Sequence, residues 1–329
     1  MAGIGEYAAQ RRAEGVYWHD IADELITQFP ETAQLTHTQR YDTARNKFRT
    51  IQKQRARSNQ EEKKRIMREG SAVNLLPEVY DHEHPGMTHI RIGIVSDTHF
   101  GSKYAQYSAL QEFYAQCKQL GITDIYHAGD IDDGSETMHI GVMYEHHCIG
   151  ATEHIRNIVE HYPQVDGIET HFITGNHDNS HMKNAGILLG EEIALRRPDM
   201  HYLGRDIAIV KLAPGCTMEL RHPGDGTSYA ISYKPQKIVE AYAGGKKPNI
   251  LIVGHYHKAM WFMQRNIHVL MAGSFCGTTP FMRSKNIASV VGGWVLDIDV
   301  DDAGTIKALT PTFYPFYDEV ENDWRILDA

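Results

Sequence analysis

Residues 1–70 place their hydrophobic side chains with the period of an α-helix. In YWHDIADELITQF the apolar positions from Trp18 to Phe29 recur three and four residues apart, and a proline then ends the pattern. In THTQRYDTARNKFRTIQ the apolar positions from Tyr41 to Ile51 occupy one face of a second helix. We therefore expect this segment to form a small all-α domain.

The pattern changes after a stretch that carries glycine, proline and mixed polarity. This stretch, residues 71–88, is interpreted as a linker. Beyond it, β-branched apolar runs such as HIRIGIVSD and ITDIYHAGD alternate with helical patterns, and shorter strands follow. We expect residues 89–329 to form an α/β domain in which helices cover two sheets, a two-sheet α/β/β/α sandwich.

Composition is that of a globular protein, with 42% hydrophobic residues in 329. No stretch approaches the roughly 18 apolar residues of a membrane span, and the first residues lack the apolar segment of a secretory signal. The four cysteines are widely spaced and form no C-x-x-C pair. This spacing indicates reduced thiols, so we expect a cytoplasmic protein with no membrane partner.

Charge is distributed unevenly along the chain. The net charge is −9, but residues 40–69 carry eleven basic and four acidic side chains, a net +7, which leaves −16 elsewhere. Two short helices of which the second is basic resemble a helix-turn-helix DNA-binding unit, with Arg45 and Arg49 as candidate DNA contacts. The alternative is a helical hairpin with solvated charges, or one that joins two copies into a homo-oligomer.

Polar side chains that can bind metals follow almost every expected strand. In α/β folds, ligand sites lie beyond the carboxyl ends of the strands. Five such ends carry histidine, aspartate or asparagine, in the motifs DTH, GDIDDG, GNHD, RHPG and GHYH. One such residue alone is usually a turn or cap residue, but five in one domain indicate a shared site. Of five neighbouring histidines, most are expected to be packing or surface residues and one or two to touch substrate: His127, His139, His146, His147 and His181.

The ordered motifs D-x-H, GD-x-x-D, GNH-D, a lone histidine and GH-x-H resemble the calcineurin-like metallophosphoesterase superfamily. The resemblance covers about residues 89–315 and is closest in motif style to the phosphodiesterase and repair-nuclease branch. It implies that seven side chains hold two divalent metal ions in one cleft. These are Asp97, His99 and His257 for the first ion, Asn176, His222 and His255 for the second, and Asp130 as the bridge.

The resemblance also implies a reaction, in which a water between the two cations attacks phosphorus in line. His177 is expected to supply a proton to the leaving group, with Asp133 holding its ring in one tautomer and Asp178 in support. Mixed imidazole and carboxylate ligands favour Mn, with Fe, Zn or Mg as alternatives. Lys103 and Arg283 are candidate phosphate contacts, for which a solvated charge is the competing interpretation.

The expected substrate is DNA. Protein phosphatases of this superfamily carry arginine after GD-x-x-D and glutamate after GNH, whereas this chain has Gly134 and Asp178 at those places. A basic unit would give an acidic catalytic body affinity for a polyanion. We therefore expect a metal-dependent DNA phosphodiesterase, an exo- or endonuclease in the cytoplasm of a bacterium or a phage-infected host. One alternative is a phosphoesterase for a small nucleotide or metabolite, and another is an inactive DNA-binding regulator.

Overall fold

The computed structural model divides the chain into two compact units, residues 1–76 and 77–329. The structure describes residues 3–14, 16–50, 79–83, 88–139, 141–245 and 247–328. Within these ranges no helix is long and apolar enough to cross a membrane. Residues 51–70 of the expected helical domain lie outside the described ranges, as do 71–78 and 84–87 of the expected linker.

The smaller unit is a set of short helices that pack together. Its elements are α1 (Ile4–Ala13), α2 (Trp18–Gln28), the 3-10 turn η1 (Pro30–Thr32) and a helix over residues 37–50. Ile21, Leu25 and Ala44 are fully buried where these helices meet, as the helical period predicts. Ile26 also belongs to the apolar face of α2, but it is 41% exposed, so the small bundle buries only part of that face.

The larger unit is built on two six-stranded sheets, with strand orders β12-β11-β2-β3-β4-β5 and β1-β6-β7-β8-β10-β9. The first sheet contains β2 (His89–Val95), β3 (Asp124–Ala128), β4 (Glu169–Thr174), β5 (Met200–Arg205), β11 (Gly292–Val300) and β12 (Ile306–Pro315). The second contains β1 (Val79–Asp81), β6 (Ile207–Ala213), β7 (Cys216–Arg221), β8 (Ile250–Val253), β9 (Ala259–Gln264) and β10 (Ile267–Ala272).

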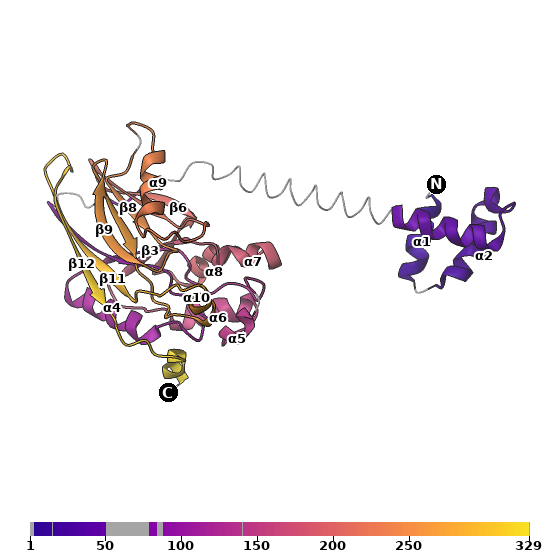
Figure 1. The fold of residues 1–329 in the computed structure, drawn as a ribbon, viewed down its shortest axis with the longest axis horizontal. Helices are drawn as coiled ribbons and strands as arrows, with labels where there is room; N and C mark the ends of the chain where they lie inside the picture. The colour runs from indigo at the N-terminus through magenta and orange to yellow at the C-terminus, as the bar shows by residue number, and fades with distance from the viewer. Residues whose placement is uncertain are drawn as a thin grey trace. The chain divides into compact units, whose positions relative to one another are not determined.

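Helices cover the outer faces of both sheets, which gives the expected α/β/β/α layers (Figure 1). On the first sheet lie α4 (Tyr107–Gln119), α6 (Ala151–His161) and α8 (Leu189–Arg196), and on the second lies α9 (Tyr233–Ala241). Shorter elements are α5 (Val142–Glu145), α7 (Asp178–Ala185), α10 (Pro280–Ser284) and η2 (Asp323–Asp328).

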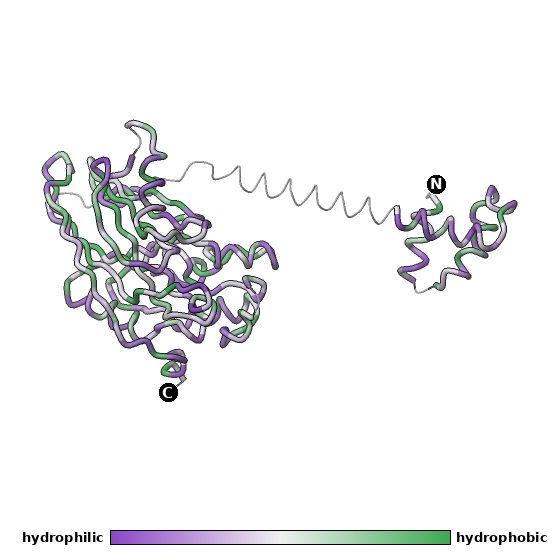
Figure 2. The backbone as a smooth tube through the Cα atoms, in the orientation of Figure 1, coloured by the Kyte–Doolittle hydropathy of each residue, from purple (hydrophilic) through white to green (hydrophobic). Residues whose placement is uncertain are grey.

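Alternation along the strands separates the apolar side chains into layers. Figure 2 shows hydrophobic stretches along the backbone of the larger unit. On β8, Ile252 points between the two sheets, whereas Leu251 points outward, into the layer that contains Val239 of α9. Phe172 of β4 and Phe113 of α4 belong to the third layer, between the first sheet and its helices. This packing fixes the relative positions of the strand ends.

Strand β1 lies inside the segment that the sequence analysis interprets as a linker. Val79–Asp81 pairs in parallel with β6, through Ile209 to Lys211, and forms one edge of the second sheet. Three residues are too few to show the two-residue period of a strand, so the sequence pattern does not reveal this element.

The carboxyl ends of β2, β3 and β4 meet at one edge of the first sheet, because these strands are parallel. β7 and β8 are likewise parallel in the second sheet. Glycines permit close approach at these ends. A Cβ on Gly175 would overlap Asp130 Oδ1 and the His222 ring, and one on Gly254 would overlap the Ala128 carbonyl oxygen and Ser96 Oγ.

We expect Gly175→Ala to lower the free energy of unfolding by about 1–3 kcal/mol, because the added methyl group has no space beside Asp130 and His222. Gly244→Ala is the matched control, since a Cβ there meets no atom within 4 Å. The control should stay within about 0.5 kcal/mol of the parent. Urea unfolding followed by circular dichroism measures both, and an unchanged midpoint for Gly175→Ala would contradict the close packing.

Candidate metal centre

The seven side chains proposed as metal ligands come together where five strands end. Asp97 and His99 follow β2, Asp130 follows β3, Asn176 follows β4, His222 follows β7, and His255 and His257 follow β8. Five of them line a cavity of about 570 Å³: His99, Asp130, Asn176, His255 and His257. Asp97 and His222 are buried directly beside these five, within contact distance of His257 and Asp130.

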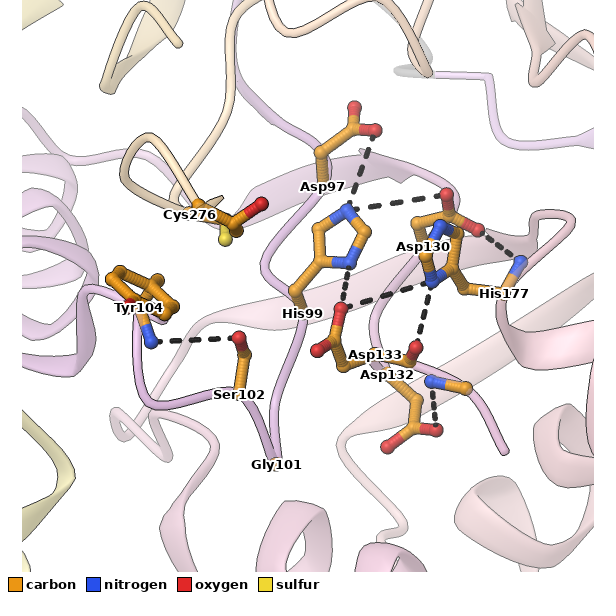
Figure 3. Close-up of polar contacts among 12 residues, drawn as sticks. Asp97, His99, Gly101, Ser102, Tyr104, Asp130, Asp132, Asp133, His177 and Cys276 are labelled. Atoms are coloured by element: carbon orange, nitrogen blue, oxygen red, sulfur yellow. Dashed lines mark hydrogen bonds and ion pairs between the residues drawn. The ribbon is translucent and has the colours of Figure 1, made fainter. Parts of the chain in front are cut away.

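Asp97, His99 and His257 form one group of possible ligands. The Nε2 atoms of His99 and His257 are 3.1 Å apart, and Asp97 Oδ1 lies 3.3 Å from His257 Nε2 and 3.9 Å from His99 Nε2. Figure 3 shows His99 facing both Asp97 and Asp130. Two ligand atoms that each lie about 2.0–2.2 Å from the same cation are separated by distances similar to these three, so the group could bind one cation.

Asp130, His222 and His255 form a second group. His222 Nε2 lies 3.0 Å from Asp130 Oδ2, and that same oxygen is 4.0 Å from His99 Nε2 of the first group. Asp130 therefore lies between the two groups, where a bridging carboxylate would lie. The main-chain N–H of His177 donates to its other oxygen at 2.9 Å, which fixes the carboxylate plane.

Main-chain carbonyls set the orientation of two of these rings. His222 Nδ1 donates to the Ala128 carbonyl at 2.7 Å, and His255 Nε2 donates to the Asp225 carbonyl at 2.6 Å. Since a carbonyl oxygen only accepts, each contact places a proton on the nitrogen that donates, and the opposite ring nitrogen is the one that can bind a metal. His257 is held similarly, with Nδ1 at 3.2 Å from Ser274 Oγ.

Two buried polar atoms show that this donor set fits metal ions. Among the buried polar atoms of the described residues that lack a hydrogen-bond partner is Asn176 Oδ1, and His222 Nε2 has only the ion pair with the Asp130 carboxylate at 3.0 Å. A buried polar atom without a partner costs about 1–3 kcal/mol, so such atoms are rare unless something else binds them. Both belong to the set that the resemblance assigns to the second ion. Imidazole nitrogens, carboxylates and an amide oxygen together suit two divalent cations.

The backbone is strained at most of these positions. A positive φ is unusual for residues other than glycine, and where the structure shows one, a functional constraint is a common reason. Five of the seven residues adopt it: Asp97 (52°), His99 (47°), Asp130 (54°), His255 (75°) and His257 (53°). The strain turns side chains from successive strand ends into one cavity.

Buried charges dominate the electrostatics of the site. Burial raises the pKa of the Asp97 carboxyl, but the charges and hydrogen bond of the surrounding histidines, His257 and then His222, together outweigh it and the net shift is downward. Burial likewise opposes ionisation of Asp130, yet His222 keeps its pKa well below the usual range. For His222, burial lowers the pKa, but Asp130 outweighs it and raises the pKa to about 10. Metal binding to this ring therefore has to displace a proton.

Asp133 contacts both His99 and His177, but through different atoms. Its carboxylate accepts from His99 Nδ1 at 2.8 Å, whereas its main-chain carbonyl accepts from His177 Nδ1 at 2.7 Å. The carboxylate is 3.7 Å from His177 Nδ1 (Figure 3). The structure thus differs from the expectation that the Asp133 carboxylate holds the His177 ring: the main-chain carbonyl accepts from Nδ1, because the carboxylate is turned toward His99.

Asp178 joins two of the loops that carry site residues. Its buried carboxylate accepts main-chain hydrogen bonds from Asp132 at 2.8 Å and from Gly175 at 2.7 Å. A carboxylate that receives two main-chain donors fixes the path of both segments. Asp178 thus holds the site loops together, and its support of His177 stays a prediction.

A buried aspartate behind the site has histidine partners that the sequence analysis missed. Asp132 accepts from His154 Nδ1 at 2.6 Å and from His181 Nε2 at 2.7 Å. These are hydrogen-bond lengths, and all three side chains are buried. His146 lies nearby, with Nε2 3.2 Å from Asp133 Oδ2. The sequence feature that could have indicated this cluster is Asp132, the aspartate of GDIDDG that is not part of the GD-x-x-D motif.

The two expected phosphate contacts in the larger unit point elsewhere. Lys103 Nζ donates to the Tyr144 carbonyl at 2.7 Å, and exposed Arg283 donates to the Thr278 carbonyl at 3.1 Å. Neither lines the cavity, whereas Lys285 does. No pattern in the sequence distinguishes Lys285 from its neighbours, because its position depends on the turn after α10.

The basic residues of the smaller unit fall into two kinds. Arg40 is buried and donates from Nε to the Ala22 carbonyl at 3.0 Å, so it belongs to the packing of the helices. The Arg45 guanidinium lies over the Tyr41 ring at 5.4 Å, and Arg49 is exposed. Arg40 therefore does not belong to the exposed basic surface of the described part of this unit, although it is one of the eleven basic residues counted between residues 40 and 69.

Comparison with known proteins gives a family match over most of the larger unit. Residues 90–291 match the calcineurin-like phosphoesterase superfamily domain. No curated protein matches the chain.

Solved structures of low sequence identity align with a large part of the chain. A novel archaeal phosphodiesterase is 14% identical over 68% of this chain and 100% of its own, with a TM-score of 0.39. GAP50 of Plasmodium, described as the anchor in the inner membrane complex, is 12% identical over 71% and 87%, with a TM-score of 0.41. Vps29 of Entamoeba histolytica complexed with zinc is 13% identical over 69% and 99%, with a TM-score of 0.34.

The family match covers more than half of the chain, and the residues that converge in the cavity are histidines, aspartates and an asparagine suited to divalent cations. The chain therefore belongs to the calcineurin-like phosphoesterase superfamily and is a metal-dependent phosphoesterase.

Proposed function

We propose that this chain is a phosphodiesterase that hydrolyses DNA with the help of two divalent cations, Mn²⁺ first among them. The observation that carries the proposal is the complete donor set around Asp130, with two groups of ligands on either side of one carboxylate. The basic helix of the smaller unit supports a polyanionic substrate.

One cation would be held by Asp97, His99 and His257. The other would be held by Asn176, His222 and His255, and Asp130 would bind both. When bound, such cations neutralise phosphoryl oxygens and make water a better nucleophile at neutral pH. The contribution of the chain is to fix the ligands. Main-chain carbonyls, Ser274 and the Asp133 carboxylate orient the imidazole rings.

His177 is placed to assist the leaving group. Nδ1 donates its proton to the Asp133 carbonyl, so the second proton of the imidazolium form lies on Nε2, and this is the proton that the ring can give to the leaving group. The side chain is partly exposed and lines the cavity. It is outside both groups of proposed ligands around Asp130, and a proton on Nε2 would meet the oxygen that departs from phosphorus.

The size of the cavity favours a second candidate function, the hydrolysis of a small nucleotide. A volume of about 570 Å³ lies in the range of small-molecule pockets. Hydrolysis of labelled DNA and of cyclic nucleotides by the same protein separates the two functions, because a small-nucleotide enzyme cleaves cyclic nucleotides faster than DNA.

We expect Asp133→Asn to weaken metal binding by about 10–100-fold, because His99 loses its charged acceptor. Titration of the metal-depleted full chain with Mn²⁺ measures this loss. Asp302→Asn, an exposed aspartate of the same unit, is the matched control and should bind as the parent does. Metal affinity equal to that of the control would contradict this role for the Asp133 carboxylate.

We expect His177→Ala to retain its metals and to lose about 10²–10⁴-fold in rate on diesters with poor leaving groups. Bis-p-nitrophenyl phosphate, whose leaving group needs no proton, should be affected far less. His161→Ala, at the end of α6, serves as the control. Equal losses on both substrates would contradict a proton donated at Nε2.

We expect replacement of both Arg45 and Arg49 by alanine to weaken DNA binding and to reduce its salt dependence by about one counterion for each phosphate contact removed. Arg156→Ala on α6 is the control. Hydrolysis of bis-p-nitrophenyl phosphate with Mn²⁺ should be unchanged in all three proteins. If the salt dependence of DNA binding is unchanged in the double variant, these helices do not contact DNA. If the parent hydrolyses no diester with any divalent metal, the proposed function as a whole is contradicted.

A further inference from the structure

A second cluster of histidine and aspartate lies on β3 and β4, away from the carboxyl ends that carry the metal centre, and beside the residue that follows β1. Asp124 is the first residue of β3, His171 is near the start of β4, and His82 follows β1. One possible ligand atom from each lies within 4.8 Å of the other two. His82 and His171 also line a cavity of about 710 Å³.

The separations within this cluster match those of ligands on a common cation. Asp124 Oδ1 is 3.0 Å from His171 Nε2 and 3.3 Å from His82 Nε2, and the two ring centroids are 4.4 Å apart. Two bonds of about 2.0–2.1 Å at a tetrahedral angle place their ligand atoms roughly 3.3 Å apart. The same carboxylate oxygen thus faces both Nε2 atoms.

Neighbouring groups hold two of the three side chains in this orientation. His82 Nδ1 and the Tyr126 hydroxyl are 2.6 Å apart, which directs Nε2 toward Asp124. The second oxygen of Asp124 accepts from Thr123 Oγ1 at 2.6 Å, which directs Oδ1 toward the rings. Hydrogen bonds on the far side of each ligand are characteristic of protein metal sites.

We propose that His82, Asp124 and His171 bind a third divalent transition-metal ion, of which Zn²⁺ is the best match to two imidazoles and one carboxylate. Three protein ligands leave a position for water or an exchangeable ligand on the side of the cavity. The ion would connect β1 of the second sheet to β3 and β4 of the first. The site is independent of the proposed function, because it shares no residue with the centre around Asp130.

The test is the number of Zn²⁺ ions that the full chain binds after removal of metals with a chelator. Equilibrium dialysis with elemental analysis should give one equivalent fewer in His82→Gln and in His171→Gln than in the parent. His201→Gln is the matched control: its ring stacks on His171 at 5.0 Å, but its Nε2 is bound to Glu169 at 2.6 Å. This variant should bind as many ions as the parent, and all four proteins should hydrolyse bis-p-nitrophenyl phosphate equally.

Unchanged stoichiometry in both variants would overturn the proposal and leave the cluster as a hydrogen-bonded network. His82 follows a strand end and its side chain is 33% exposed, so His82→Gln decides the question should His171→Gln fail to fold. Co²⁺ gives an independent readout, because the loss of one tetrahedral site lowers the visible absorption of the Co²⁺-loaded chain. Equal spectra for the parent and His82→Gln would also overturn it. Loss of diester hydrolysis in the parent would count against the proposed function and leave this test intact.

Discussion

Two buried carboxylates, Asp97 and Asp130, impose the constraint on which the larger unit depends. Ionised groups are costly to bury unless opposite charge and hydrogen-bond donors surround them. The chain supplies these from separate strand ends: the main-chain N–H of His255 donates to Asp97 at 3.0 Å, and that of His177 donates to Asp130 at 2.9 Å. The positive φ angles and the crowded Gly175 follow from bringing so many groups to one point.

The layered fold could be predicted because its strands and helices are long and periodic. In β8, successive residues face opposite layers, and in α2 the buried positions recur with the helical period. What the pattern could not supply was set by tertiary contacts. Strand β1 has only three residues and exists because β6 offers it a partner, and Ile26 is exposed because the bundle is small.

The convergence of the seven side chains could also be foreseen, since parallel strands bring their carboxyl ends to one edge. The atoms that orient them could not. Whether Asp133 meets His177 through its carboxylate or its main chain depends on the path of the loop after β3. The same holds for Lys285 and His154, which reach their places through tertiary packing and carry no local motif.

The three residues of β1 also determine where the larger unit can be truncated without exposing the edge of its second sheet. β1 covers the outer side of β6, a strand that is apolar from Ile207 to Ala213 except for Lys211. A fragment that begins after residue 83 would leave the N–H and C=O groups along that side without partners. An exposed sheet edge of this kind can pair with the same edge of a second molecule, so the fragment would self-associate through main-chain hydrogen bonds. A fragment that begins at Pro77 retains this protection.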